Sequence, residues 1–177
     1  MSFKFILFEG VDGSGKSTLA KGLAEKINGV YYHSPPKILE PLRVFANKSV
    51  PEVRLHYFLL GNVIASEEIK ELLKASHVVC DKYIFSTLAF HQVLLGRKLP
   101  WQNVLMPDII VYTTADIEEV DRRLNSRDSR TIYEERDFLE KVAKEYDEIL
   151  SNFKNVVRID TTGRDPAELV EEMIKFL

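Results

Sequence analysis

Short apolar runs rich in β-branched and aromatic residues recur along the chain. They do not alternate cleanly between apolar and polar positions, so they are typical of strands buried on both faces of a parallel sheet. The segments between the runs are long enough to hold helical crossovers. The runs predict strands at residues 3–8, 30–33, 77–80, 109–113 and 156–160.

Helix signals occupy the segments between these runs. A helix from residue 16 is predicted to end at Asn28-Gly29, a usual C-terminal signal. Residues 49–76 carry a largely apolar stripe and predict a long helix. Asp116 begins a segment with capping-box spacing, and Pro166 stands at the first position of the last predicted helix, after Asp165.

Strands that alternate with helices predict an α/β fold of the doubly wound class, with right-handed crossovers. The length of 177 residues predicts one domain over residues 1–177. Residues 121–136 are charged and nearly without apolar side chains, which indicates a short surface lid and not a second domain.

The overall charge narrows the classes of partner. With 24 basic and 27 acidic side chains, the net charge is −3, which argues against the broad basic surface that nucleic-acid binding needs. Any anion-binding site must therefore be formed by a local group of basic residues.

The single cysteine, Cys80, excludes an intrachain disulfide and fits a reducing cytosol. No apolar stretch is long enough to span a membrane, so we expect a cytoplasmic protein without a membrane partner.

The strongest chemical signal is a phosphate-binding loop (P-loop). Residues 10–17 fit the pattern G-x-x-x-x-G-K-[ST], between an apolar strand and a helix, as the motif requires. Backbone N–H groups and the helix dipole would hold phosphates, Lys16 would reach the terminal ones, and Ser17 would ligate Mg²⁺. The residues predicted to bind ATP are Gly10, Val11, Asp12, Gly13, Ser14, Gly15, Lys16, Ser17 and Thr18.

Several classes of nucleotide-binding protein use such a loop. A GTPase would need an Asn-Lys-x-Asp guanine reader, and the nearest string, at residues 47–50, lacks the Asp. Motor proteins and larger ATPases are usually much longer. A small phosphotransferase fits this length best, and a nucleotide-binding regulatory ATPase is the alternative from another class.

Three segments resemble thymidylate kinases, which belong to the nucleoside-monophosphate kinases. They are FEGVDGSGKST at 8–18, DKYIFSTLAF at 81–90 and MPDIIVYT at 106–113. The resemblance implies a three-layer fold with a five-stranded parallel sheet of order 2-3-1-4-5, helices on both faces and a mobile lid. It also implies Mg²⁺-dependent phosphorylation of dTMP to dTDP by ATP, and a homodimer. A deoxynucleoside kinase and another pyrimidine monophosphate kinase are the alternatives among enzymes.

Residues that follow the third predicted strand point to the acceptor side. Asp81 ends a buried run, so it is placed at the strand tip, where doubly wound sheets bind ligands. The resemblance implies that Asp81 helps to hold Mg²⁺ and that Asp12 meets the 3′-hydroxyl of the acceptor. Lys82 stands where the family has Arg, which keeps the positive charge but loses the bidentate fork. Helix capping by Asp81 and a turn role for Asp12 are the structural alternatives.

Further basic residues are candidates for contacts with phosphate groups. The resemblance makes Lys37 and Arg43 candidates for the acceptor phosphate. Arg123 and Arg127 are four residues apart and would share a helical face, beside the phosphoryl group in transfer. A solvated charged surface is the alternative for each of them.

The predicted base pocket departs from the family pattern. Family members read the thymine carbonyl with an Arg near the middle of the long helix, but residues 58–63 contain none. Asn62 is the candidate for a hydrogen bond to the base, Phe58 and Leu59 for packing on its face, and Phe90 for excluding a 2′-hydroxyl. A buried core helix is the alternative for Phe58 and Leu59. The spacing of the histidines does not suggest a metal site, so His33 is predicted to be structural.

Overall fold

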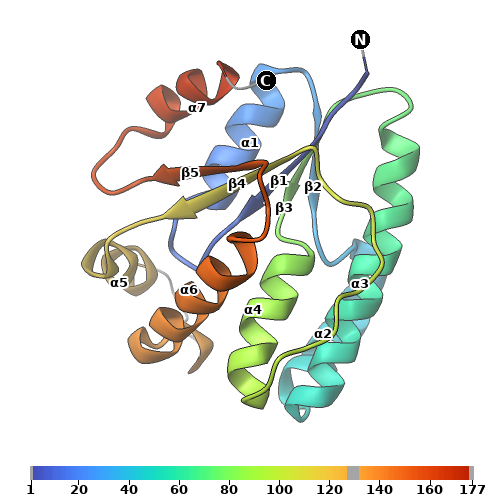
Figure 1. Ribbon diagram of the computed structural model, residues 1–177, viewed down its shortest axis with the longest axis vertical. Helices are drawn as coiled ribbons and strands as arrows, with labels where there is room; N and C mark the ends of the chain where they lie inside the picture. Colours follow the sequence, from blue (N-terminus) through green and yellow to red (C-terminus); the bar gives the residue numbers. More distant parts are fainter. Residues whose placement is uncertain (1, 127–131, 176–177) are drawn as a thin grey trace.

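Five parallel strands form the core of the protein in the computed structural model, which describes residues 2–126 and 132–175 (Figure 1). Their spatial order is β2-β3-β1-β4-β5, which confirms the predicted sheet. The observed strands begin and end within two residues of the predicted ones. The strands are β1 Phe5–Glu9, β2 Val30–His33, β3 Val78–Asp81, β4 Ile109–Thr114 and β5 Val156–Asp160.

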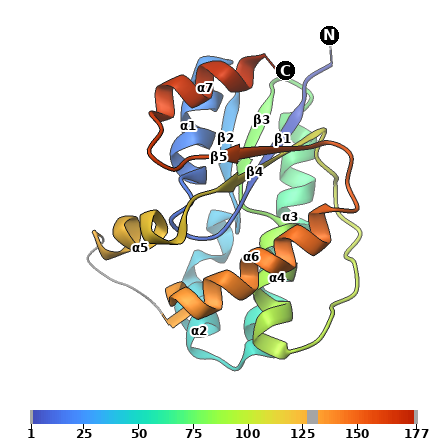
Figure 2. The ribbon, with the colours of Figure 1, turned by 60° about the vertical axis from the view of Figure 1, so that its left-hand side comes forward.

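Helices cover both faces of this sheet, which confirms the three-layer architecture. Figures 1 and 2 show α1 and α7 on one face, with α3, α4 and α6 on the other. The short helix α2 packs on α3. The helices are α1 Lys16–Lys26, α2 Glu40–Lys48, α3 Pro51–Leu72, α4 Ile84–Leu95, α5 Ile117–Asn125, α6 Arg136–Leu150 and α7 Pro166–Ile174.

Strand β1 shows why the apolar runs do not alternate. Ile6 and Phe8 are fully buried against α1 and α7. Phe5 and Leu7 are buried in the separate layer beneath α3, α4 and α6. Because successive strand side chains point to opposite faces, both sets of positions must be apolar in a strand that is covered on two sides.

All three predicted helix ends are observed, although one of them lacks the predicted side-chain cap bond. Asn28 has a φ of 51° just after α1, as its C-terminal signal predicts. Asp165 caps α7 by accepting a hydrogen bond from the Ala167 N–H at 2.7 Å. Asp116 is the N-cap residue of α5, as predicted, but its side chain makes no cap hydrogen bond to the helix. Instead the Asp116 N–H donates to Thr162 Oγ1 at 2.9 Å, which ties this loop to the one after β5.

The carboxyl ends of the central strands meet along one edge of the sheet. Asp81 pairs in register with Phe8 on one side and with His33 on the other. Polar side chains from three strands are therefore brought together there, beside the loop that follows Glu9.

None of the helices in the described parts of the chain is both long and apolar enough to cross a membrane.

Candidate functional site

The loop between β1 and α1 has the backbone that its glycines predict. Gly10 has a φ of +147°, and a Cβ atom there would lie 2.3 Å from the Thr113 carbonyl oxygen. Gly15, with a φ of +85°, is the N-cap of α1. Because other residues disfavour these conformations, the glycines let the loop curl tightly over the sheet edge and enter the helix. This is the geometry that a P-loop needs.

Lys16 lies inside this loop. Its side chain is only 4% exposed, and Nζ donates to the Val11 carbonyl at 3.0 Å and to Asp12 Oδ1 at 3.2 Å. Burial, together with the charge of Lys82, lowers the pKa of Lys16. The ammonium is therefore held by the loop at the place where the motif predicts the terminal phosphates of a nucleotide.

Neighbouring strands hold the loop in place. Ser14 Oγ lies 2.8 Å from Thr113 Oγ1, and Thr161 Oγ1 donates to the Ser14 carbonyl at 3.0 Å. Arg123 Nη1 donates to the Gly13 carbonyl at 3.1 Å and to Thr161 Oγ1 at 2.9 Å, while Nη2 donates to the Thr161 carbonyl at 2.9 Å. The Arg123 guanidinium thus fastens the P-loop to the segment after β5, and it does not line the main cavity described below.

Asp12 lies between two lysines. Lys82 Nζ is 2.7 Å from Asp12 Oδ1, and Lys16 Nζ contacts the same oxygen. Burial alone would raise the pKa of Asp12, but the charges of Lys82 and Lys16 hold it well below its ordinary value. The three side chains form a compact charged cluster between the P-loop and the start of α4.

Asp81 lies at the tip of β3, as predicted. Tyr31 donates to its Oδ2 at 2.9 Å, and His33 Nδ1 lies 3.6 Å from the same atom. Asp81 Oδ1 is buried without a hydrogen-bond partner in the described parts of the chain. Burial opposes ionisation, yet a hydrogen bond from His33 and the charge of Lys16 lower the pKa to about 2. The carboxylate is therefore ionised at neutral pH with one oxygen unused.

Glu9 links the P-loop strand to α4. It is fully buried, and Oε1 accepts the N–H groups of Tyr83 and Ser86 at 3.0 and 3.2 Å. The Tyr146 hydroxyl donates to Oε2 at 3.0 Å. Burial raises the pKa of Glu9 to about 7, although these hydrogen bonds act in the opposite direction. Glu9 thus fixes the first turn of α4 relative to the loop.

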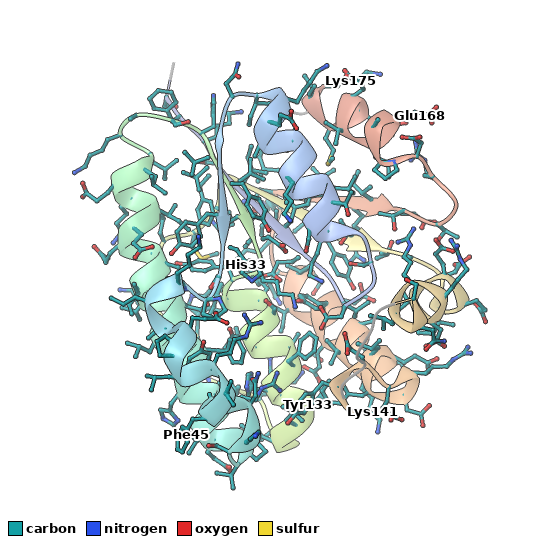
Figure 3. All side chains as sticks on the ribbon, turned by 180° about the vertical axis from the view of Figure 1, so that it is seen from behind. His33, Phe45, Tyr133, Lys141, Glu168 and Lys175 are labelled. Atoms are coloured by element: carbon teal, nitrogen blue, oxygen red, sulfur yellow. The ribbon has the colours of Figure 1, made fainter. Side chains whose placement is uncertain are left out.

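A main cavity of about 500 Å³ opens beside this cluster. Its walls combine cations with aromatic rings, and its volume lies in the range of small-molecule sites. His33 and Tyr133, both labelled in Figure 3, belong to its lining although they are distant in the sequence. The lining residues are Asp12, His33, Ser34, Pro35, Arg43, Asn47, Arg54, Phe58, Lys82, Tyr83, Ser86, Thr87, Phe90, His91, Tyr133 and Glu134.

The structure brings part of the predicted acceptor set into this cavity. The predicted residues that line it are Asp12, Arg43, Phe58, Lys82 and Phe90.

Three other predicted acceptor residues do not line the cavity. Lys37 is exposed on a short 3₁₀ segment, and Leu59 packs against the core. Asn62 is buried and donates to Thr87 Oγ1 at 3.0 Å, so it positions a wall residue. The predicted lid residue Arg127 lies outside the described residues.

Several cavity residues escaped the sequence analysis. Arg54 lies one helical turn before Phe58, whereas His91, which directly follows Phe90, was expected at the rim of the pocket without an assigned role. His33, predicted to be structural, both contacts Asp81 and lines the cavity. Helical spacing from Phe58 was the available signal for Arg54, whereas no local pattern marks His33 or Tyr133.

This arrangement is suited to group transfer between two anionic ligands. The P-loop offers one phosphate site, and the main cavity offers a second set of cations next to it. The shared Asp12–Lys82 contact sets the two sites side by side. Such proximity and charge neutralisation are what direct phosphoryl transfer requires.

Comparisons with known proteins all point to one family. A family model described as thymidylate kinase matches residues 8–174. A probable thymidylate kinase of Methanococcus aeolicus is 34% identical, with 98% of this chain and 95% of the relative covered. One from Methanocaldococcus jannaschii is 32% identical with the same coverage. Among solved structures, thymidylate kinase from Candida albicans shares the fold, with a TM-score of 0.79, 21% identity, and 99% and 91% of the two chains covered.

Proposed function

The chain belongs to the thymidylate kinase family, and we propose on this basis that its main cavity holds dTMP while its P-loop holds ATP. The reaction is phosphorylation of dTMP to dTDP. One observation carries the assignment of sites: Arg43 and Lys82 line a cavity that shares Asp12 with the P-loop. A protein that only hydrolyses ATP needs no such second set of cations.

On the donor side, the P-loop residues hold the phosphates of ATP. Backbone N–H groups of the loop and the positive end of α1 contact the phosphate oxygens. Lys16, already held at the centre of the loop, stabilises the negative charge that develops on the terminal phosphoryl group. Arg123 keeps the loop closed against the segment after β5 through its bonds to Gly13 and Thr161.

On the acceptor side, Lys82 and Arg43 bind the phosphate of dTMP. Lys82 has a φ of +67°, and its N–H donates to the Phe8 carbonyl at 3.0 Å, so its backbone position is fixed at the sheet edge. Asp12 accepts a hydrogen bond from the sugar, and Phe90 packs where a 2′-hydroxyl would lie. The acceptor phosphate is thereby held next to the terminal phosphate of ATP, so that its oxygen attacks phosphorus in line.

Residues at the mouth of the P-loop fit a magnesium ion. Asp81 has a buried, unpartnered and ionised oxygen, and Ser17 is exposed on the first turn of α1 nearby. Mg²⁺ prefers carboxylate and hydroxyl oxygens and keeps several waters. Asp81 and Ser17 would hold the ion, which supplies charge neutralisation on the donor phosphates when bound.

The lid supplies a further cation in this proposal. Arg123 is fastened to the P-loop, so Arg127 is the predicted lid arginine that is left to meet the transferring group. Charge on the equatorial oxygens of the transition state is what an added guanidinium stabilises. This role predicts an effect on kcat larger than the effect on either Michaelis constant.

We also propose a homodimer in the cytoplasm. Helix α3 exposes Val53, Leu60 and Val63 along its outer side, with exposed fractions of 40%, 49% and 42%. A shared apolar face on this helix would bury them. Sedimentation of the wild-type chain and of Leu60→Glu tests this, with a dimer expected for the first and a monomer for the second.

The free, buried thiol of Cys80 is compatible with a reducing compartment.

Acceptor dependence tests the proposed reaction. ADP formation from ATP should be negligible without an acceptor and should rise by at least about a hundredfold with dTMP, since water in the cavity is a poorly positioned acceptor. ADP formation that is equal with and without dTMP would instead support the regulatory ATPase.

A further inference from the structure

Two side chains of the main cavity, Arg54 and His91, are not used in the mechanism above. Arg54 comes from α3 and His91 from α4, and both contact Phe58. The Arg54 guanidinium carbon lies 5.3 Å from the centre of the Phe58 ring, and the His91 ring centre lies 5.6 Å from it. The Arg54 guanidinium also lies 4.0 Å from the centre of the Tyr133 ring. These four residues form one wall of the cavity.

Three nitrogen atoms in this wall have no hydrogen-bond partner. They are Nε and Nη1 of Arg54 and Nε2 of His91, and the statement covers the described parts of the chain. All three atoms are shielded from water. A buried polar group without a partner is costly, so folded proteins rarely keep one unless a ligand or water completes it. Three together in the lining of one cavity indicate a ligand with matching groups.

The roles of these nitrogens follow from their other contacts. His91 Nδ1 lies 2.8 Å from the Thr87 carbonyl oxygen, which can only accept, so Nδ1 carries the proton. Burial lowers the pKa of His91 to about 4, which leaves the ring neutral at pH 7. Nε2 is then an acceptor, whereas the guanidinium of Arg54 only donates. The wall therefore offers donors beside an acceptor.

The His91 side of this wall lies away from Lys82 along α4. Lys82 precedes α4, and His91 lies eight residues beyond Tyr83, which is about 12 Å along a helix that rises 1.5 Å per residue. A nucleotide whose phosphate contacts Lys82 extends along α4 in this direction. The base of such a nucleotide would reach His91 and, across the Phe58 ring, Arg54.

We propose that Arg54 and His91 together recognise the imide edge of thymine. Arg54 donates to the O4 carbonyl, and His91 Nε2 accepts the hydrogen bond of N3–H. This inference rests on the proposed function and deepens it by naming the side chains that select the base. They take the role of the arginine that the family resemblance led us to expect within residues 58–63.

Cytosine carries the opposite pattern at the same edge. Its amino group at C4 would face the donors of Arg54, and its unprotonated N3 would face the lone pair of His91. The donor then faces a donor and the acceptor faces an acceptor, and both pairs are shielded from water. A hydrogen-bonding site rejects such a base strongly. Uracil keeps O4 and N3–H and lacks only a methyl group, so the wall admits dUMP with a smaller penalty. The rings of Phe58 and Tyr133 have to move aside for the base to reach the shielded nitrogens.

A comparison of acceptors in matched variants tests the proposal. The full-length chain and the variants Arg54→Gln and His91→Gln are assayed for kcat/KM with dTMP and dCMP, which share sugar and phosphate. We expect the wild type to favour dTMP by at least about a thousandfold. Each variant should bring this ratio below about thirty, mainly by losing activity on dTMP, and should leave the KM for ATP within about twofold.

The chain offers a matched control for each variant. His56 lies on the exposed side of α3, and its Nδ1 contacts the Glu52 carbonyl at 2.7 Å, the same local bond that His91 makes. Arg97 is exposed beyond α4. His56→Gln and Arg97→Gln should keep the wild-type ratio of dTMP to dCMP. Base ratios in Arg54→Gln and His91→Gln that equal those of the controls overturn the proposal.

A measurement on the wild-type chain tests the role of His91 even if the variants do not fold. In a chain labelled with ¹⁵N histidine, saturating dTMP should shift the Nε2 resonance of His91, because an acceptor nitrogen gains a hydrogen bond, while the His56 signals stay fixed. An unmoved His91 resonance under saturating dTMP contradicts the role of His91. If the wild type turns over no dTMP, the proposed function fails; if it turns over dTMP with unchanged base ratios in the variants, only this inference fails.

Discussion

Lys82 Nζ lies 2.7 Å from Asp12 Oδ1, across 70 positions of sequence. The contact joins the residue before α4 to the P-loop, and Lys16 contacts the same carboxylate oxygen. Charges that serve the donor and acceptor sides therefore belong to one cluster. One carboxylate oxygen of Asp12 thus balances the charges of both lysines.

Lys82→Ala should weaken the acceptor side selectively. We expect kcat/KM for dTMP to fall by about a hundredfold, the scale of losing one charged hydrogen bond to phosphate, while the KM for ATP changes by no more than about threefold. Lys82→Arg is the matched variant, because it keeps the charge and restores the fork of the family residue. Steady-state kinetics with each substrate varied in turn decide the matter, and equal losses on both substrates would contradict the assignment.

Lys16→Ala should abolish most of the transfer and leave the fold intact. Ser14 and Thr161 fasten the loop to the neighbouring strands, whereas Lys16 contacts Val11 and Asp12 of the loop itself, so circular dichroism and thermal unfolding should change little. We expect kcat to fall by at least about a hundredfold, because one preorganised charge on the transferring group is lost. Lys21→Ala, at an exposed position of the same helix, is the control. A folded Lys16→Ala protein with normal turnover would exclude the P-loop from the mechanism.

Arg123→Ala and Arg122→Ala should differ although the residues are adjacent. Arg123 binds the Gly13 carbonyl and Thr161, so its loss should lower the free energy of unfolding by about 1–3 kcal/mol and raise the KM for ATP by about tenfold. The Arg122 side chain is 74% exposed and pairs with Glu119 on its own helix, so its loss should change stability by less than about 0.5 kcal/mol. Urea unfolding and ATP kinetics measure both, and equal effects would show that the Arg123 contacts are unimportant.

Glu9 should make stability depend on pH. Its pKa is about 7 in the folded protein against an ordinary value of 4.5, so between these values the folded state binds more protons than the unfolded chain. Rising pH therefore removes stability, and the loss is complete above about pH 7. Relative to Glu9→Gln, the wild type should lose on the order of 3 kcal/mol between pH 4 and pH 8. Urea titrations of both proteins across this range test it, and parallel curves would contradict the raised pKa.

The strands and the P-loop could be predicted because their signals are local. A strand covered on both faces must be apolar throughout, and the P-loop needs its glycines and Lys16 at fixed spacing. Helix α4 gave no comparable signal, because its residues from Ile84 to Gln92 are all buried and leave no polar stripe. The residues that line the main cavity depend on which side of each helix faces it, and tertiary packing determines that side.

The long helix α3 shows this limit most clearly. Its residues turn by about 100° each, so Arg54 and Phe58 point in nearly the same direction, whereas Asn62 points about 80° away from Arg54. The sequence placed Asn62 in the pocket, but the packing of α3 on α4 turns it toward Thr87. Tyr133, in the short 3₁₀ segment Ile132–Glu134 before α6, reaches Arg54 only through tertiary packing. No spacing rule along the chain contains that information.

Transfer of labelled phosphate tests the central claim most directly. The full-length chain is incubated with ATP labelled at the γ-phosphate, and dTMP and thymidine are supplied as acceptors in separate reactions. With Arg43 and Lys82 holding an acceptor phosphate, label should appear in dTDP, and thymidine should be used at least about a thousandfold less efficiently, since those cations would be left unpaired. Efficient labelling of thymidine, or no labelling of dTMP, would contradict the account.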